Sequence, residues 1–528
     1  MAPDMQTPVS LLEPGRNCWR IERAARAAVI VDADDYFKAA RAAMMSAKTQ
    51  ILLVGWDFDA RIRFGGDIDD GGPDRVGAFL SWLVRRTPGL QVHILRWDTG
   101  AIKTLFHGQT LLRIARWIKD PQIHLRLDGH HPPAGSHHQK VVVIDDDVAF
   151  CGGIDMTVDR WDTREHADDE PRRLEPDGTP YGPWHDATTM LQGPVAKALG
   201  DMCRARWQVS GGEELAPACA EGDCWPGHVD ADFTDVEVGI ALTVPEMAEQ
   251  EPRHEIEALY VDLIARAKRW FYAESQYFAS RKVAEAIARR LAEPDGPEFV
   301  IVHPTSAQGW LEPIAMDSAR ARLVEALREH DPHGRLRLYH PYTAGGQPIY
   351  VHAKVTVIDD DILRVGSSNF NNRSLRLDSE CDVVIDTGRD ANEDERETIA
   401  GIRNALLAEH LDTDCETIED LLARTGSIIR TIEELRGEGR SLRPYEVPEL
   451  DSVREWLADH KVLDPEGPGE MFEALSKRTP LLARIKRRPH LRREDGSLSP
   501  VTTALVAMGA AAGAALLGTL ISKGRADK

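Results

Sequence analysis

Residues Ser136–Asp155 read S-H-H-Q-K-V-V-V-I-D-D-D-V-A-F-C-G-G-I-D. The stretch sets a histidine, a lysine, an aspartate, a glycine pair and a last acidic residue at fixed spacings: His138, Lys140, Asp145, Gly152-Gly153 and Asp155. The same spacings return downstream, with a glycine-serine pair and an amide in the last positions: His352, Lys354, Asp359, Gly366-Ser367 and Asn369. One such string arises by chance, but two in register indicate an internal duplication.

The residues after each lysine predict a buried strand. Val141–Ile144 and Val355–Ile358 are short, mostly apolar and rich in β-branched side chains. Because side chains alternate along a strand, His138 and Lys140 should point to the same side. An imidazole and an ammonium group on one side form a site for an anion, above all for a phosphate.

The other motif positions support this site. Asp145 and Asp359 are seven residues from their histidines and have the opposite parity, so we expect them to anchor strand ends and not to contact substrate. The glycine pairs would let backbone segments approach closely, and the last polar residue of each copy would lie beside the phosphate. Since the two copies differ at these positions, we expect unequal half-sites with divided roles.

Length and composition restrict the class of protein. A chain of 528 residues can hold two domains or one strongly duplicated domain. Its net charge of −22 argues against a nucleic-acid binder. The seven scattered cysteines indicate a reducing compartment, with neither a disulfide framework nor metal-ligand spacing. The N-terminus has no apolar core of a signal peptide.

Both halves of the chain repeat one order of elements. In the first we expect a helix, two strands and a second helix: Asp34–Ala47, Gln50–Gly55, Val92–Leu95 and Thr104–Ile118. In the second we expect the same order: Glu255–Lys268, Trp270–Ala273, Phe299–Val302 and Ser318–Glu329. We therefore predict an α/β fold of two pseudo-repeated lobes.

This gives a division of the chain into six segments. We assign an N-terminal extension to 1–30, a first lobe to 31–210, a linker to 211–235, a second lobe to 236–411, a helical appendage to 412–500 and a tail helix to 501–521. The tail has 21 uncharged residues, about 31 Å as a helix, which matches a bilayer core of about 30 Å. Basic residues precede it, so a membrane anchor would keep the large domain on the cytoplasmic face; a soluble or peripheral helix is the alternative.

Residues around the two motifs add to the pattern. The first motif is followed by Arg160-Trp161-Asp162 and Pro183-Trp184-His185-Asp186, and the second is flanked by Glu274-Ser275-Gln276-Tyr277-Phe278 and Asp378-Ser379-Glu380. From about Asp32 to Leu411, the chain resembles the phospholipase D superfamily with its paired HKD motifs. The opening Glu13–Arg20 resembles a bacterial phospholipase D-like and transphosphatidylase subgroup.

The resemblance implies a mechanism and an architecture. In each lobe a mixed sheet would be flanked by helices, with the active site at the lobe interface. His138 would be the nucleophile that forms a phosphohistidine, and His352 the general acid and base, although the sequence alone does not rank them. Catalysis would further involve the two lysines, an amide and three carboxylates: Lys140, Lys354, Asn369, Asp155, Glu380 and Asp162. We expect Glu380 to orient His352, and Asp162 to orient His138.

Substrate-binding residues are expected from both lobes: Trp56, Asp57, Gln276, Tyr277 and His185. For His185 and Asp186 two interpretations stay open, since they either position a headgroup or pair with each other. We expect no metal and no cofactor, because two lysines already stabilise the charge of the phosphate.

The resemblance favours hydrolysis of a phospholipid headgroup, giving phosphatidic acid and an alcohol, with headgroup exchange when a small alcohol replaces water. The alternatives are a synthase of the cardiolipin or phosphatidylserine type, a nuclease, and an inactive membrane-tethered scaffold. We expect a monomer that acts at a phospholipid membrane surface and does not bind nucleic acid.

Overall fold

The computed structural model describes residues 9–448 except 66–69, 99–119, 133–134, 219–221, 248–249 and 308–311. The helix predicted over Thr104–Ile118, the end of the appendage and the tail at 501–521 lie outside the described residues. Within the described ranges, no helix has the length and apolar character needed to cross a membrane.

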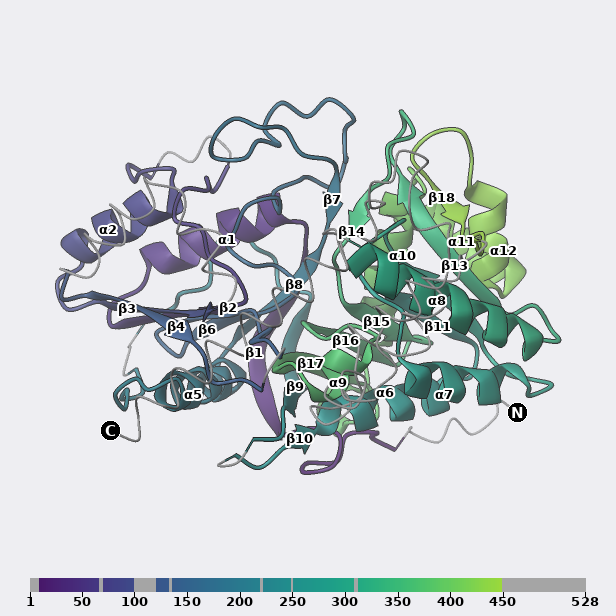
Figure 1. The fold of residues 1–528 in the computed structure, drawn as a ribbon, viewed down its shortest axis with the longest axis horizontal. Coiled ribbons are helices and arrows are strands. Elements are labelled where there is room, and N and C mark those ends of the chain that lie inside the picture. Colours follow the sequence, from purple (N-terminus) through teal and green to yellow (C-terminus); the bar gives the residue numbers. More distant parts are fainter. Residues whose placement is uncertain are drawn as a thin grey trace, which may run out of the picture. The chain divides into compact units, whose positions relative to one another are not determined.

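The described strands build one large mixed sheet (Figure 1). Its first-lobe strands are β1 (Arg20–Val31), β2 (Gln50–Gly55), β3 (Gln91–Trp97), β4 (Ile123–Asp128), β5 (Val141–Ile144), β6 (Val148–Gly152) and β8 (Ala187–Gln192). Its second-lobe strands are β9 (Phe233–Val244), β10 (Arg253–His254), β11 (Trp270–Glu274), β12 (Glu298–Val302), β13 (Leu336–Tyr342), β15 (Val355–Ile358), β16 (Ile362–Gly366), β17 (Glu380–Asp386) and β18 (Ser441–Pro444). A separate parallel pair joins β7 (Trp184–His185) to β14 (Tyr350–Val351).

Strand order shows the duplication directly. The sheet runs β18-β13-β12-β11-β15-β16-β17-β9-β1-β8-β6-β5-β2-β3-β4. In each half three strands are parallel (β2, β3, β4 and β11, β12, β13), and the motif hairpin (β5–β6 and β15–β16) pairs antiparallel beside them. The halves meet where β1 and β9 pair antiparallel. The predicted α/β fold of two pseudo-repeated lobes is confirmed.

Helices cover the sheet in both halves (Figure 1). They are α1 (Ala33–Met45), α2 (Val76–Arg86), α5 (Pro194–Val209), α6 (Glu255–Arg266), α7 (Arg281–Leu291), α8 (Glu312–Glu329), α9 (Asn372–Arg376), α10 (Arg396–His410), α11 (Cys415–Thr425) and α12 (Ile428–Leu435), with a 3-10 turn at Asp390–Asn392. Buried side chains of α5, α10, α11 and α12 belong to one hydrophobic cluster. The clusters of α1 with α2 and of α6 with α7 are separate from it. The appendage helices α11 and α12 thus pack onto the core.

The anchoring role predicted for the motif aspartates is confirmed. Asp145 accepts hydrogen bonds from the backbone amides of Lys48, Thr49 and Gln50, at 2.6 to 2.8 Å. Asp359 accepts three equivalent bonds, from the amides of Lys268, Arg269 and Trp270 at 2.8 to 3.0 Å. Each aspartate therefore fixes the start of the strand that lies beside its own motif strand.

The segment predicted as an N-terminal extension contains most of β1. Its residues, RIERAARAAVIV, alternate poorly between apolar and polar side chains, so a strand could not be predicted from their pattern. In the structure β1 is hydrogen-bonded on both edges, to β8 and β9. It is the strand through which the first lobe joins the second.

Candidate active site

The two motif lysines directly precede β5 and β15, and the side chain of each bends back to the backbone of the histidine in the same motif. Lys140 Nζ donates to the carbonyl oxygen of His138 at 2.9 Å, and Lys354 Nζ donates in the same way to that of His352. The two half-sites also act on each other, because Lys354 lowers the pKa of His138 and Lys140 lowers the pKa of His352. The motifs from the two lobes thus converge on one site.

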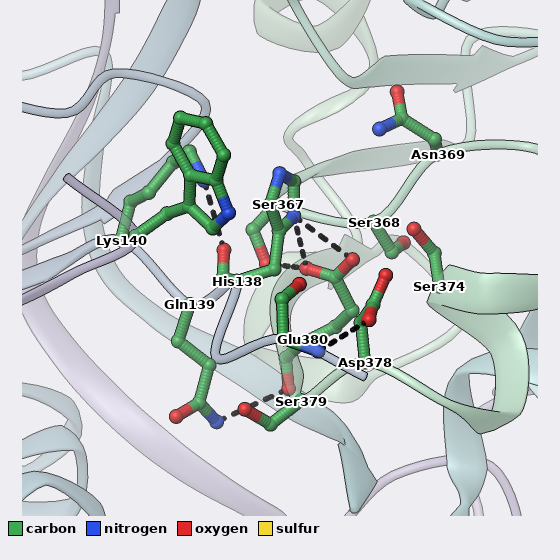
Figure 2. Close-up of polar contacts among 12 residues, drawn as sticks. His138, Gln139, Lys140, Ser367, Ser368, Asn369, Ser374, Asp378, Ser379 and Glu380 are labelled. Atoms are coloured by element: carbon green, nitrogen blue, oxygen red, sulfur yellow. Dashed lines mark hydrogen bonds and ion pairs between the residues drawn. The ribbon is translucent and has the colours of Figure 1, made fainter. Parts of the chain in front are cut away.

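His138 is held by a carboxylate of the other lobe. Its Nδ1 donates to Glu380, with distances of 2.9 and 3.0 Å to the two carboxylate oxygens (Figure 2). Since Nδ1 carries the proton, Nε2 keeps a lone pair. The neighbouring His137 is fully buried and lies 3.0 Å from Ser379 Oγ, so it does not compete for the site.

His352 mirrors this arrangement with a carboxylate of the first lobe. Its Nδ1 donates to Asp186 Oδ2 at 2.7 Å. The sequence-based expectation that Glu380 orients His352 is therefore wrong, because each histidine takes its carboxylate from the opposite lobe. Asp186 was left open as a headgroup ligand or as the partner of His185, and its side chain instead bonds His352.

Asp162, expected to orient His138, does something else. It is fully buried and lies 3.1 Å from His166 Nδ1, while it also accepts from Arg173 and from the backbone amide of Trp184. That expectation is wrong, because Glu380 occupies the position beside His138.

The last polar residues of the motifs lie beside the histidines, with different partners. Asp155 Oδ2 is 3.3 Å from Lys140 Nζ, and its Oδ1 accepts from the amide of Trp56 at 3.0 Å. Asn369 in the second copy has its Oδ1 3.5 Å from Ser275 Oγ. Figure 2 shows Asn369 and Lys140 on either side of the His138 ring. The first lysine thus has an anionic neighbour where the second copy offers an amide.

The second residue of each motif pair, Gly153 or Ser367, lies against the carboxylate that orients one of the histidines. A Cβ atom on Gly153 would stand 2.0 Å from Asp186 Oδ1, so only glycine fits there without a shift. Ser367, at the equivalent position, donates to Glu380 Oε2 at 2.5 Å. The first positions of the pairs are equally tight, since Cβ atoms on Gly152 and Gly366 would meet Thr188 and Asp382.

Burial and the lysine charges determine the protonation of the site. Burial lowers the pKa of His138 and of His352 well below the ordinary value, and the lysines lower both further, which favours the neutral form of each imidazole before an anion binds. Burial raises the pKa of Glu380 to about 7 and that of Asp186 to about 6, and it lowers the pKa of Lys354 to about 7. An anion bound between the lysines would favour their charged forms.

The predicted substrate-binding residues divide into two groups. Trp56 stacks on Trp97, with ring centroids 5.6 Å apart, and approaches the His138 ring edge-on at 6.4 Å. Gln276 donates to the hydroxyls of Tyr350 and Tyr277 at 2.9 and 3.2 Å. Tyr350 in turn stacks on Trp184, whose ring lies 5.3 Å from that of His352. These aromatic rings therefore line both histidines.

Asp57 and His185 belong to the second group, because other protein groups engage them. Asp57 forms an ion pair with Arg96 and accepts from Thr157. His185 is completely buried, and its Nε2 lies 2.8 Å from Glu274. The structure does not support the headgroup role considered for His185, because its side chain is buried and protein carboxylates lie beside both ring nitrogens; it forms no hydrogen bond with Asp186 either.

Sequence reasoning missed Asp186 as the partner of His352. A signal was present, because Asp186 lies between β7, which ends at His185, and β8, which begins at Ala187, and neighbouring side chains along extended backbone point to opposite sides. His185 on one side and Asp186 on the other could not share a role. Arg160 was also missed; its guanidinium lies 4.4 Å from the Trp184 ring centroid, and its charge lowers the pKa of His352.

Comparisons with known proteins agree with this geometry. A family model described as phospholipase D matches residues 43–222, and one described as cardiolipin synthase, PLD-like domain, matches residues 260–399. Phospholipase D alpha 1 of Carica papaya is 24% identical over 372 residues, covering 50% of this chain and 46% of that protein. Phospholipase D alpha 1 of Arabidopsis thaliana is 23% identical over 524 residues, covering 72% and 64%.

A solved structure extends the likeness to the fold. Phosphatidylserine synthase of Haemophilus influenzae superposes with a TM-score of 0.50 at 13% identity, over 79% of this chain and 97% of that one. At this identity the match shows a common fold only. The chain spans about half the length of the first curated relatives that it matches.

Proposed function

The chain belongs to the phospholipase D superfamily of phosphodiesterases and phosphatidyltransferases, and on this premise we propose that it hydrolyses the headgroup phosphodiester of a phospholipid. The products are phosphatidic acid and a free alcohol. One observation carries the proposal: two imidazoles are each oriented by a carboxylate of the opposite lobe, and each has a motif lysine beside it.

The reaction proceeds in two displacements. His138 Nε2 attacks phosphorus, the bond from phosphorus to the headgroup oxygen breaks, and His352 gives its proton to the leaving alcohol. Water then gives a proton to His352 and attacks the phosphohistidine, which releases phosphatidic acid. Lys140 and Lys354 hold the non-bridging oxygens and stabilise the charge that develops on them. The bound anion offsets the lysine charges, so His352 can carry the proton that the first step needs.

The second candidate is a phosphatidyltransferase of the cardiolipin or phosphatidylserine synthase type. It is favoured by the match of residues 260–399 to the cardiolipin synthase, PLD-like model. The chemistry of the first step is the same, and only the acceptor differs, since an alcohol replaces water. The net charge of −22 disfavours a nuclease.

The setting of the enzyme belongs to the same proposal. We propose a monomer that acts at a phospholipid membrane surface on the cytoplasmic side, because the two lobes of one chain together supply both histidines and both orienting carboxylates. Anchoring by the tail at 501–521 is a further part of it, supported by the uncharged stretch in the sequence. Fractionation of the full chain and of a 1–499 version tests the anchor, and equal recovery in the soluble fraction would exclude it.

The experiment is an assay of the full chain on phosphatidylcholine vesicles, with and without ethanol, followed by separation of the lipids. The proposal predicts phosphatidic acid in water and phosphatidylethanol with ethanol, and neither in His138→Ala or His352→Ala. Formation of cardiolipin from phosphatidylglycerol, without hydrolysis, would favour the synthase. Cleavage of single-stranded DNA without turnover of any lipid would overturn the proposal.

A further inference from the structure

A cluster of four metal-ligating side chains lies directly behind the His352 half-site. Its members come from the end of β1, from the loop before β7, from β7 and from α10: Asp32, His166, His185 and Glu409. All four are buried, with at most 5% of their surface exposed. One ligand atom from each lies within 4.8 Å of the others.

The spacing of these atoms fits four ligands around one ion. His185 Nδ1 lies 2.8 Å from Glu409 Oε1 and 3.3 Å from Asp32 Oδ1. His166 Nε2 lies 3.1 Å from Glu409 Oε1 and 3.5 Å from Asp32 Oδ2. Metal–ligand bonds of about 2.0 to 2.2 Å in a tetrahedron put neighbouring ligands about 3.3 to 3.6 Å apart. The four separations between a histidine nitrogen and a carboxylate oxygen, 2.8 to 3.5 Å, are close to this range, so the side chains need only a small shift to surround one ion.

The outer nitrogens of both rings face carboxylates, as they do in metal sites. His166 Nδ1 is 3.1 Å from Asp162, and His185 Nε2 is 2.8 Å from Glu274. Such partners fix the tautomer that turns the lone pair of the other nitrogen inward, toward a metal. The same Glu274 also accepts from Tyr272 at 2.6 Å, which holds this second carboxylate in place.

Two inward-facing atoms lack any hydrogen bond. His185 Nδ1 and Asp32 Oδ2 are both buried and have no hydrogen-bond partner, although carboxylate oxygens surround the histidine nitrogen. A buried polar atom without a well-directed hydrogen bond is costly. A cation bound between these atoms would remove this cost.

The charges in contact with the cluster leave room for a divalent ion. Four carboxylates meet here, Asp32, Asp162, Glu274 and Glu409, and two imidazoles lie between them. Two guanidinium groups balance part of this charge, since Arg164 pairs with Glu409 and Arg173 pairs with Asp162. The carboxylates therefore outnumber the guanidinium groups by two, and either protons on the histidines or a divalent ion would offset this excess.

We propose that Asp32, His166, His185 and Glu409 bind one divalent transition metal ion, of which Zn²⁺ best fits a closed set of two imidazoles and two carboxylates. The ion takes no part in the reaction. It joins three segments of the first lobe to α10 of the second and supports the His352 half-site. Asp32 Oδ1 accepts from the amide of Asp186 at 3.0 Å, and the carbonyl of His185 accepts from the amide of His352 at 2.7 Å.

The test is the metal content of the full chain, produced without a histidine tag and measured by elemental mass spectrometry. We expect about one zinc per chain, lost in His166→Gln and Glu409→Gln and retained in His330→Gln, a control on an exposed histidine. His138→Ala should also retain the metal, which separates this proposal from the proposed activity. X-ray absorption at the zinc edge should show nitrogen and oxygen ligands only.

A second measurement covers variants that fail to fold. Removal of the metal from the wild-type chain with a strong chelator should lower its melting temperature by several degrees, and added Zn²⁺ should restore it. A wild-type chain that carries less than about a tenth of an equivalent of any transition metal, and whose melting temperature does not respond to Zn²⁺, Mn²⁺ or Fe²⁺, would overturn the proposal. In that case protons on the two histidines would take the place of the ion.

Discussion

The two half-sites follow one plan but differ in their details. In each, a lysine bonds its own histidine carbonyl and a carboxylate of the other lobe holds the ring. The first half sets Asp155 beside its lysine, whereas the second has Asn369 at that position and a lysine with a pKa of about 7. Ser367 donates to Glu380, while Gly153 only leaves space for Asp186.

Neither lobe contains a complete half-site, because each histidine takes its orienting carboxylate from the other lobe. His138 and Glu380 are 242 residues apart, and His352 and Asp186 are 166 apart. Each imidazole depends on a carboxylate of the opposite lobe for its tautomer, so neither lobe can act without the other. The differences between the copies are therefore the positions where divided roles should appear in experiments.

The largest effect is expected from removal of either ring. His138→Ala and His352→Ala should each lower the rate of lipid hydrolysis by at least about 10⁴-fold, since both displacements need both groups. A substrate with a p-nitrophenol leaving group sharpens the comparison, because that group leaves without a proton. Release of p-nitrophenol in a single turnover should survive in His352→Ala and not in His138→Ala; the reverse result would exchange the two roles.

Removal of the orienting carboxylates should cost about 10²- to 10⁴-fold in kcat, because an amide no longer fixes the tautomer of the histidine. Glu380→Gln acts through His138 and Asp186→Asn through His352, so the ratio of the two losses measures the inequality of the halves. Glu285→Gln, on the surface of α7, serves as the control. A wild-type rate in either variant would remove the crossed pairing from the mechanism.

The lysines should differ in their pH profiles. Lys354, with a pKa of about 7, loses its charge as the pH rises through that value, so kcat/KM should fall on the alkaline side. Glu380 and Asp186, with pKa values of about 7 and about 6, become protonated as the pH falls, so kcat/KM should also fall on the acid side. Lys354→Ala should lower kcat/KM about 10²-fold and abolish the alkaline decline, whereas Lys140→Ala should retain it. An alkaline decline that persists in Lys354→Ala would refute this assignment.

An exchange of the pair residues should give the smallest effects. Ser367→Gly removes the hydrogen bond that the hydroxyl donates to Glu380 and the one that it accepts from the amide of Cys381, and we expect about a tenfold loss in kcat. The opposite change, Gly153→Ser, forces a Cβ against Asp186 and should cost more, about 10²-fold. Thr179→Ala, on an exposed turn, is the control for loss of a hydroxyl. Equal losses in both variants would mean that the two positions are equivalent.

The features that could be predicted from the sequence are those that a local residue pattern determines. The runs after Lys140 and Lys354 are the strands β5 and β15, entirely buried, and the parity of Asp145 and Asp359 indicated their anchoring role. These features depend on neighbours along one strand. They needed no knowledge of tertiary structure.

The crossed pairing could not be predicted in this way, because it depends on which side chains meet across the two lobes. Glu380 follows the second motif in the chain, which suggested a partner in the same lobe, yet it bonds His138. The role of His185 was predicted wrongly for the same reason, since no residue near it in the sequence indicates its contacts with Glu274 and Glu409. The strand β1 was missed because arginine and alanine mask its alternation.

The most direct measurement is a crystal structure of the full chain with orthovanadate, which takes the trigonal bipyramidal geometry of a phosphorus atom under attack. We expect vanadium between the two rings, with His138 Nε2 at one apex and His352 Nε2 facing the opposite apical oxygen, and with both lysines on the equatorial oxygens. A structure in which vanadate binds at one histidine while the other ring cannot reach it would contradict the account.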